Sequence, residues 1–450
     1  DGVAHQVVPP LAELGGHLDA GSLLPTNGAL DPAAISAAAP ALQAASRAMS
    51  ALDVRIDRIP TSGTVPAVAS AVTRLRTASD EGASLLSSLS GAARVLPGML
   101  GAEGERRYLL LVQNNAELRS DGGIPGAVAV VTADHGALAL ETQSAAFGFP
   151  QPVVPLSAGE RGLYGDNLGR YLQNVTMTPD FARSGVLAQA MWRDRTGETV
   201  DGVIAVDPVA LSAVLAVTGP VTLPDGTVLD RRNAVSTLLS GTYQRFADPA
   251  AQDAFFAGAA RAVFERVVSG RSSPTALARA VGDAATQGRI LVWSAHPEEQ
   301  RVVAAAGVAD LLPRTDPSRT ELGVYLVDNT EAKMDYYLRS AISVSAARCR
   351  ADGRPLVDVG VDLTSVAPQD AATALPAYVT GGRRGLGVEK GEIRTTAYLY
   401  APAGSAIYDV RVDGRSNPFI AAVDDGHPAA GITTTLRPGE VAHVTFLLVA

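Results

Sequence analysis

The sequence has one cysteine and few histidines. Cys349 cannot form a disulfide within the chain, and we expect its thiol to be a small buried group in a strand. The six histidines are scattered, and none pairs at the spacing of zinc ligands. The sequence therefore excludes an internal disulfide and argues against a zinc site.

Long basic and apolar runs are also missing. The net charge is −9 and the largest basic clusters are pairs such as Arg106-Arg107, so we expect no nucleic-acid partner. No segment approaches the ~20 apolar residues that span a bilayer. The sequence begins at Asp1 and not at Met, so we expect either a soluble protein or a targeting or membrane-anchoring segment outside this sequence.

The composition is that of a globular chain. Hydrophobic residues make up 47% of it, which allows a well-buried core, and the length favours roughly three domains. We expect a helical segment at 1–104, an α/β core with a helical block at 105–315, and a β-sandwich at 316–450. The abundance of Ala, Gly and Val resembles that of actinobacterial proteins.

The expected elements follow from hydrophobic periodicity and from cap residues. In the first segment, Asp31 and Pro32 begin one helix, and further helices cover Val68–Leu75 and Leu85–Leu96, the last stopping before Pro97. Core strands are expected at 108–112, 126–131, 137–140 and 203–206, and core helices at 181–196, 208–217, 231–246, 249–269, 273–287 and 297–307. Sandwich strands are expected at 324–327, 336–344, 357–363, 395–400, 407–412 and 441–449.

The densest polar segment, residues 113–123, follows the first core strand. Ligands of α/β sheets bind beyond the carboxyl ends of strands, so this segment is a candidate site. Its amides, carboxylates and guanidinium suit a cation, a phosphate or sugar hydroxyls, and Gly122-Gly123 would let backbone N–H groups approach an anion. The alternative is a capped turn. The candidate residues are Asn114, Asn115, Glu117, Arg119 and Asp121.

Further candidates are dispersed along the chain. Asp180 and Asp207 each precede a helix and are also N-cap candidates, while Asp207 follows the strand 203–206 at its carboxyl end. Asp201 precedes that strand and is a weaker candidate. The remaining candidates are Asp166, Asn167, Arg170 and Arg245, and alternation places Lys333, Asp335 and Tyr337 on one strand face as a salt-bridged surface or a domain contact.

Several segments resemble domain-of-unknown-function family 4012. They include Arg107–Leu111, Asn114–Arg119 with Gly122-Gly123, Thr178–Phe181, Val200–Leu211 with Gly219–Val221, and Lys333–Tyr337, over about residues 70–345. The resemblance implies an extracytoplasmic cell-envelope protein with an N-terminal membrane helix.

The order of features also distantly resembles the LytR-CpsA-Psr enzymes, which transfer glycan from a polyprenyl-pyrophosphate carrier to the wall. Arg119-Ser120-Asp121 matches their Arg-Ser-Asp motif, and Arg245 is the nearest candidate for an arginine that contacts pyrophosphate. The resemblance implies a LytR-CpsA-Psr-like layered α/β core. Asn114-Asn115 stands where those enzymes carry an Asp-x-Arg element.

Three functions remain open. In glycan phosphotransfer, Arg119 and Arg245 would bind pyrophosphate, and Asp121 with Glu117 or Asp180 would hold Mg²⁺. In a glycoside hydrolase or transglycosylase acting on wall glycan such as D-arabinan, two carboxylates among Glu117, Asp121, Asp166, Asp180 and Asp207 would suffice. A non-catalytic envelope scaffold needs neither. The expected partner is cell-wall polysaccharide or a lipid-linked glycan. No G-x-S-x-G, P-loop or H-E-x-x-H motif supports another chemistry.

Overall fold

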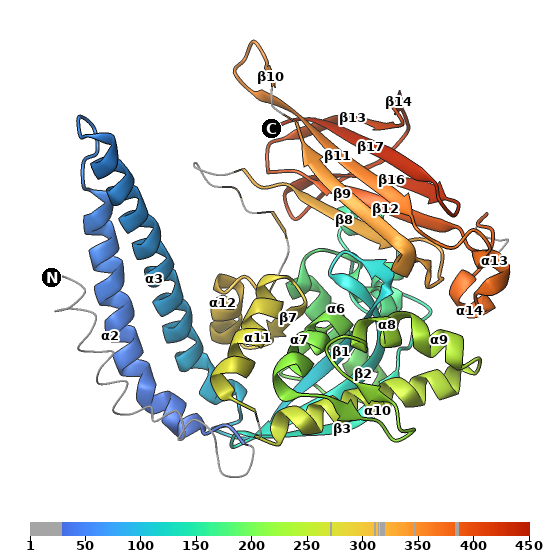
Figure 1. Cartoon of the computed structure of the whole chain (residues 1–450), viewed down its shortest axis with the longest axis horizontal. Helices are drawn as coiled ribbons and strands as arrows, with labels where there is room; N and C mark the ends of the chain where they lie inside the picture. The colour runs from blue at the N-terminus through green and yellow to red at the C-terminus, as the bar shows by residue number, and fades with distance from the viewer. Residues whose placement is uncertain are drawn as a thin grey trace.

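The computed structural model describes residues 29–270, 272–309, 312–313, 315, 320–345, 348–382 and 387–450. Figure 1 shows a long helical hairpin, a central α/β layer and a β-rich part stacked above that layer. None of the helices in these ranges is long and apolar enough to cross a bilayer.

The hairpin consists of α2 (Pro32–Asp57) and α3 (Pro66–Met99). Asp31 caps α2 by accepting hydrogen bonds from the backbone N–H groups of Ala33 and Ala34, as expected. The prediction of two helices in the second half of this segment is wrong. Nothing between them breaks the helix, and Pro97 lies in the last turn of α3, which ends two residues later at Met99.

A five-stranded sheet forms the central layer, in the order β3-β2-β1-β4-β7. Only β1 and β4 pair in parallel, and the other neighbours are antiparallel. The α/β class is confirmed, but β7 lies between helices in the block that we expected to be wholly helical. The strands are β1 (Arg106–Arg119), β2 (Gly122–Asp134), β3 (Ala137–Ala145), β4 (Gly202–Val206) and β7 (Ile290–Ser294).

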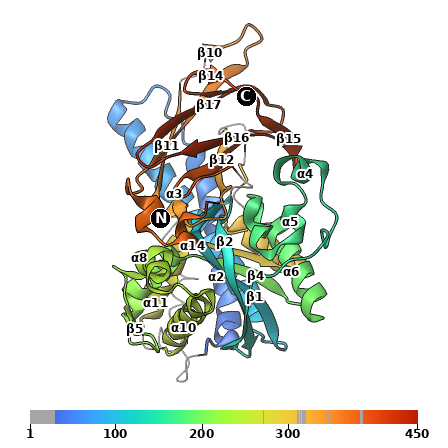
Figure 2. The same ribbon diagram turned by 90° about the vertical axis from the view of Figure 1, so that its right-hand side faces the viewer.

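Helices cover both faces of this sheet. Figure 2 shows α10 and α11 on one side and α5 and α6 on the other. Phe181, Leu187 and Met191 of α6 pack with Leu109 and Leu111 of β1 in one buried cluster. The elements are α4 (Ala158–Tyr164), α5 (Asn167–Arg170), η2 (Leu172–Met177), α6 (Phe181–Thr196), α7 (Pro208–Thr218), β5 (Val221–Thr222), β6 (Val228–Leu229), α8 (Ala234–Ser236), η3 (Thr237–Gly241), α9 (Thr242–Arg245), α10 (Pro249–Val268), α11 (Pro274–Thr286) and α12 (Pro297–Ala305).

The β-rich part is a two-sheet sandwich. One sheet has the order β10-β11-β17-β13-β14, with β9 also paired to β11, and the other has the order β15-β16-β12-β8. Val361 and Phe446 of the first sheet share a buried cluster with Leu399 and Ile432 of the second. The elements are β8 (Gly323–Asp328), η4 (Met334–Tyr337), β9 (Leu338–Val344), β10 (Arg348–Cys349), β11 (Pro355–Ser365), α13 (Ala371–Ala374), α14 (Ala377–Thr380), β12 (Ile393–Tyr400), β13 (Ala406–Val412), β14 (Arg415–Ser416), β15 (Ile420–Asp424), β16 (His427–Leu436) and β17 (Val441–Val449).

Two expectations about this part are wrong. Cys349 is exposed in the short strand β10, not buried. Residues 334–337 form a 3₁₀ turn instead of the start of a strand, so Lys333, Asp335 and Tyr337 do not alternate on one strand face. Lys333 and Asp335 are buried against β1, which makes this segment a contact between the sandwich and the core.

Candidate functional site

The polar segment after Val112 is itself part of a strand. We expected this segment to follow the end of the strand, but β1 continues to Arg119 with irregularities after Val112 and after Asn114. At the second irregularity Asn114 Oδ1 accepts a hydrogen bond from the backbone N–H of Ala116 at 2.9 Å. Such bulges re-aim side chains, and here they bring consecutive polar residues to one cavity.

Gly122-Gly123 pairs with the end of β1 instead of forming an open anion loop. Gly122 has φ +115°, and a Cβ on Gly123 would lie 2.5 Å from the backbone of Asn114. Glycine is therefore needed for close approach of the two strands. The prediction that these glycines serve an anion is replaced by this packing role.

A cavity of about 730 Å³ lies between the sheet and the helices on the α10 side. One wall comes from β1 and β2, and the opposite wall from α7, η3 and α10. Its apolar lining includes Leu110, Val112, Ile124, Ala127, Val206, Leu211, Leu238, Leu239, Phe256, Val263 and Phe264. A pocket of this size with mainly apolar walls suits a hydrocarbon-bearing ligand.

Lys333 and Glu117 form a buried ion pair in the lining of this cavity. The Lys333 ammonium donates to Glu117 Oε1 and lies over the rings of Tyr243 and Tyr378, at 5.2 and 5.0 Å from their centroids. Burial lowers the pKa of Lys333 to about 8. The Tyr243 hydroxyl in turn accepts a hydrogen bond from Asn114.

Arg119 is a second buried cation in the lining. Its Nη2 donates to Asn174 Oδ1 at 3.0 Å, and its Nη1 donates to the carbonyl oxygen of Leu118 at 2.9 Å. Burial lowers the pKa of the guanidinium, although Asp328 and Asp335 oppose that shift. The Nε of Arg119 is buried and has no hydrogen-bond partner among the described residues.

Five of the candidate residues line the cavity: Asn114, Glu117, Arg119, Asn167 and Asp207. Asp207 has two further tasks. It caps α7 by accepting from Val209 and Ala210, and it binds Arg289 at 3.0 Å. Both readings of Asp207, cap and cavity residue, therefore apply.

The other candidates lie away from the cavity lining. Asp166 pairs with Arg161 at 3.3 Å, and Arg245 pairs with Asp225 at 2.8 Å on the surface. Arg170 donates to the carbonyl oxygen of Phe149, and Asp180 caps α6. Asn115 is packed beside Gly122. The prediction that Arg245 approaches a pyrophosphate site with Arg119 does not match this geometry.

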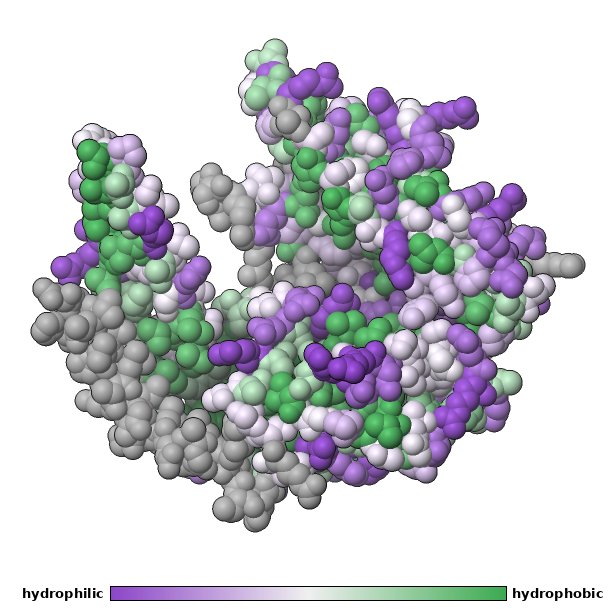
Figure 3. All heavy atoms as spheres, viewed as in Figure 1, coloured by the Kyte–Doolittle hydropathy of each residue, from purple (hydrophilic) through white to green (hydrophobic). Residues whose placement is uncertain are grey.

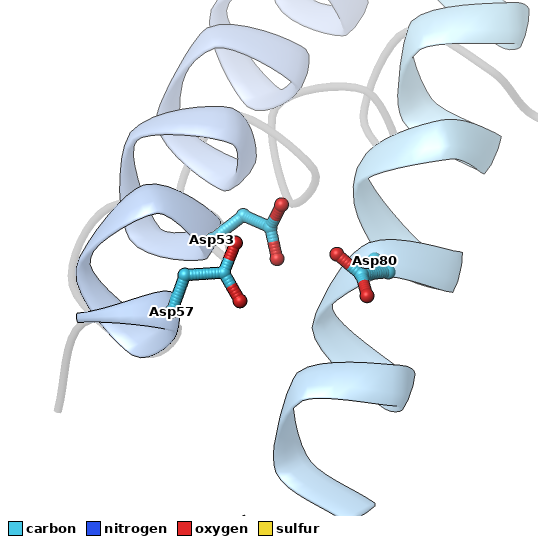
Figure 4. Close-up of side chains that lie close together, drawn as sticks. All are labelled: Asp53, Asp57 and Asp80. Atoms are coloured by element: carbon cyan, nitrogen blue, oxygen red, sulfur yellow. The ribbon is translucent and has the colours of Figure 1, made fainter. Parts of the chain in front are cut away.

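Asp121 does not fit the Mg²⁺ site predicted for it. Its side chain is fully buried, accepts a hydrogen bond from Ser184 Oγ at 2.8 Å, and is absent from the cavity lining. Within the described ranges, the one cluster with metal-ligand spacing is Asp53, Asp57 and Asp80, on the hairpin (Figure 4). That cluster is unrelated to the cavity.

Sequence reasoning missed Lys333 and Tyr243 as cavity residues. One signal was available for Lys333. It is one of only two lysines among 37 Lys and Arg residues, and it stands beside an acidic residue and two tyrosines. Tyr243 carried no signal, because a helical tyrosine is more often a packing residue.

Residues 103–243 match the model of a protein family of unknown function, DUF4012. The predicted resemblance is confirmed over this segment. The segment contains β1 and β2 and ends at Tyr243, so it supplies most of the cavity but not Lys333. No curated protein matches the chain.

Solved structures that resemble the chain share little sequence with it. Bacillus subtilis TagV is 13% identical over 48% of this chain and 89% of its own, with a TM-score of 0.27. The transcriptional regulator yvhJ of Bacillus subtilis is 10% identical over 44% and 76%, with a TM-score of 0.26. Protein gbs0355 of Streptococcus agalactiae is 11% identical over 47% and 75%, with a TM-score of 0.28. At these TM-scores the likenesses identify neither a substrate nor a reaction.

Proposed function

We propose that the chain is an extracytoplasmic cell-envelope enzyme that binds a polyprenyl-pyrophosphate-linked glycan and transfers the glycan phosphate to a wall polysaccharide. The observation that carries this proposal is the cavity itself. Its apolar walls are continuous with a polar end that holds two buried cations, Arg119 and Lys333. A prenyl chain gains about 0.8 kcal/mol for each CH₂ that it buries there.

The residues at the polar end match the requirements of phosphoryl transfer. An acceptor hydroxyl oxygen forms a new bond to the phosphorus that bears the glycan, the bridging P–O bond breaks, and prenyl phosphate leaves with the bridging oxygen. Arg119 and Lys333 stabilise the phosphate charge, and Glu117 accepts the hydroxyl proton. Asn114, Asn167 and Asn174 supply amides for sugar hydroxyls.

A glycoside hydrolase has one specific observation in its favour. Asp253 lines the same cavity as Glu117, and burial and the nearby Asp248 raise the pKa of Asp253. A carboxylic acid with a raised pKa is what a general acid requires. This second candidate needs no lipid carrier, so it predicts activity on wall glycan alone.

The test is to narrow the cavity without straining the fold. Gly126 lines the cavity, its φ is ordinary, and a Cβ there would have no neighbour nearer than 3.9 Å. Gly126→Leu places a side chain in the space for the prenyl group. Gly282→Leu, in an open position on α11, is the matched control. A prenyl-pyrophosphate-linked oligosaccharide and purified arabinogalactan are the substrates, and glycan incorporation and prenyl phosphate release are measured.

We expect transfer by the wild type and by Gly282→Leu, and at least about a tenfold loss in Gly126→Leu. Release of oligosaccharides from arabinogalactan without the lipid donor would replace this proposal with the hydrolase. If neither reaction occurs and the lipid donor does not bind, a non-catalytic envelope scaffold is the function that remains.

A further inference from the structure

The charge at the polar end of the cavity conflicts with a metal-dependent site. The proposed ligand carries a pyrophosphate, whose charge a protein usually neutralises with arginines and Mg²⁺. Asp121, the predicted Mg²⁺ ligand, is buried against Ser184 of α6 and does not line the cavity. Four carboxylates line the cavity, and two of them, Glu117 and Asp207, are paired with Lys333 and Arg289; the other two are Asp253 and Glu331. Among the described residues these four do not form a cluster with metal-ligand spacing, whereas two cations lie in the same lining.

Lys333 places a positively charged side chain permanently in the cavity. It enters the cavity from the turn before η4, and its side chain is 9% exposed. Its ammonium has three donor hydrogens, and Glu117 is its one hydrogen-bond acceptor among the described residues. The other nearby groups are the faces of Tyr243 and Tyr378, which favour a cation but accept no conventional hydrogen bond. Donors therefore remain for a phosphate oxygen.

Arg119 is a second cation beside the same ligand space. It lines the cavity together with Lys333, and its guanidinium is held by Asn174 and by the carbonyl oxygen of Leu118. Arg119 lies on β1 of the core, whereas Lys333 lies in the segment that joins β8 to β9 of the sandwich. The polar end is therefore complete only when both parts of the chain are present.

We infer that Lys333, supplied by the sandwich part, takes the place of a divalent cation and binds the phosphate end of the ligand together with Arg119. The inference rests on the proposed function for the identity of the ligand. Glu117 holds the ammonium in position, and the ammonium exchanges Glu117 for a phosphate oxygen when the ligand enters. Binding of the phosphate end needs no metal.

The first experiment measures binding of geranylgeranyl pyrophosphate to the full chain by titration calorimetry at pH 6.5 in EDTA. Geranylgeraniol, which has the same hydrocarbon and no phosphate, is the reference ligand. We expect the pyrophosphate to bind in EDTA and Mg²⁺ to change its affinity less than threefold. In Lys333→Met we expect at least a tenfold loss for the pyrophosphate and no change for the alcohol. Lys390→Met, at the other lysine, which is exposed, is the matched control.

Two further measurements test the inference even if Lys333→Met fails to fold. The chain has two lysines, so ¹³C-lysine labelling gives two side-chain signals, and we expect the pyrophosphate to shift that of Lys333 and not that of Lys390. Glu117→Gln removes the competing anion and should bind the pyrophosphate more tightly than the wild type at pH 6.5, although its transfer activity falls.

The outcomes separate the two proposals. Pyrophosphate binding that requires Mg²⁺ and is unchanged in Lys333→Met overturns this inference and leaves the proposed function standing. A Lys333 signal that does not respond to the bound ligand overturns it as well, and reduces the ion pair to a structural contact. Failure of both the pyrophosphate and the alcohol to bind contradicts the proposed function itself.

Discussion

The two ends of β1 carry polar clusters of opposite character. At the amino end, Arg106 binds Asp201 at 3.1 Å and Glu299 at 3.6 Å, and Asp201 also binds His296 at 2.8 Å. None of these residues lines the cavity. At the carboxyl end, Lys333 and Arg119 both line a large cavity, and Lys333 has more donor hydrogens than described acceptors. A polar cluster at a strand end is therefore not by itself a site. What distinguishes a site is an unsatisfied charged donor that meets space for a ligand.

The largest difference between the two clusters should appear in the pH dependence of anion binding. Burial lowers the pKa of Lys333 to about 8, so its ammonium is charged below that pH and neutral above it. We expect the affinity for geranylgeranyl pyrophosphate to fall above pH 8 by up to about tenfold per pH unit. Calorimetry from pH 6.5 to 9.5 measures this fall.

The groups that face Lys333 do not account for such a change. Those that contact it are Glu117 on β1, Tyr243 on α9 and Tyr378 on α14, and the carboxylates Asp253 on α10 and Glu331 line the same cavity. Burial raises the pKa of both tyrosines, so neither ionises in this range. Lys333→Met should bind weakly and independently of pH. An equal fall in that variant would assign the titration to another group.

The amino-end cluster should instead control acid stability. Burial disfavours the charge of Asp201, but hydrogen bonds from the Arg107 backbone, His296 and Arg106 outweigh it and lower its pKa. A lowered carboxyl pKa stabilises the fold above the unfolded-state value of about 4, and this contribution is lost as the pH falls through the folded-state value.

Asp201→Asn keeps the shape and removes that charge. We expect the free energy of unfolding at pH 7 to fall by about 2 kcal/mol, between the values for exposed and buried pairs. The wild-type advantage should shrink below pH 4, with ligand binding unchanged throughout. Urea unfolding at pH 7 and pH 3 measures the difference in the free energy of unfolding between the wild type and Asp201→Asn, with Asp194→Asn as an exposed control. A loss of geranylgeranyl pyrophosphate binding in Asp201→Asn would show that the amino-end cluster also contributes to ligand binding, and would contradict the comparison between the two clusters.

The comparison also shows what the sequence allowed us to predict. The strand 203–206, the helix that Asp207 caps, and the helix that begins after Asp180 follow from local rules, and all of them are present. Asn114, Glu117 and Arg119 were selected as polar residues beside a buried strand, and they do line the cavity. The sequence allowed a correct prediction wherever the residues that interact are close together along the chain.

The remainder depends on contacts between distant segments. Glu117 and Lys333 are separated by 216 positions, and no periodicity in either segment indicates that they meet. Asp121 satisfied the motif but lies in the turn after β1, where its carboxylate accepts from Ser184 of α6 and does not line the cavity. The short strand β7 was missed because five residues between two helices give too little periodicity to recognise.

The hairpin carries a third polar cluster, made of three carboxylates, and Arg76 lies 3.8 Å from one of them, Asp57. Asp53 and Asp57 of α2 face Asp80 of α3 (Figure 4), and repulsion from Asp53, with smaller effects of burial and Asp57, raises the pKa of Asp80. The surrounding surface includes exposed apolar side chains at Val54, Val68 and Leu75, and Figure 3 shows green patches along the hairpin. A raised carboxyl pKa contributes stability below about pH 4 that is lost as the pH rises through the folded-state value.

Asp80→Asn should therefore have the smallest effect of the three changes and the opposite sign to Asp201→Asn. We expect slower hydrogen exchange of the α3 amides around position 80 at pH 7, and no difference from the wild type in 1 M salt, which screens the repulsion. Glu81→Gln, at the adjacent exposed carboxylate outside the cluster, is the control. Faster exchange in Asp80→Asn would show that the Asp80 carboxylate stabilises the hairpin. The hairpin cluster would then be a stabilising cluster, like the ion-paired cluster at the amino end of β1.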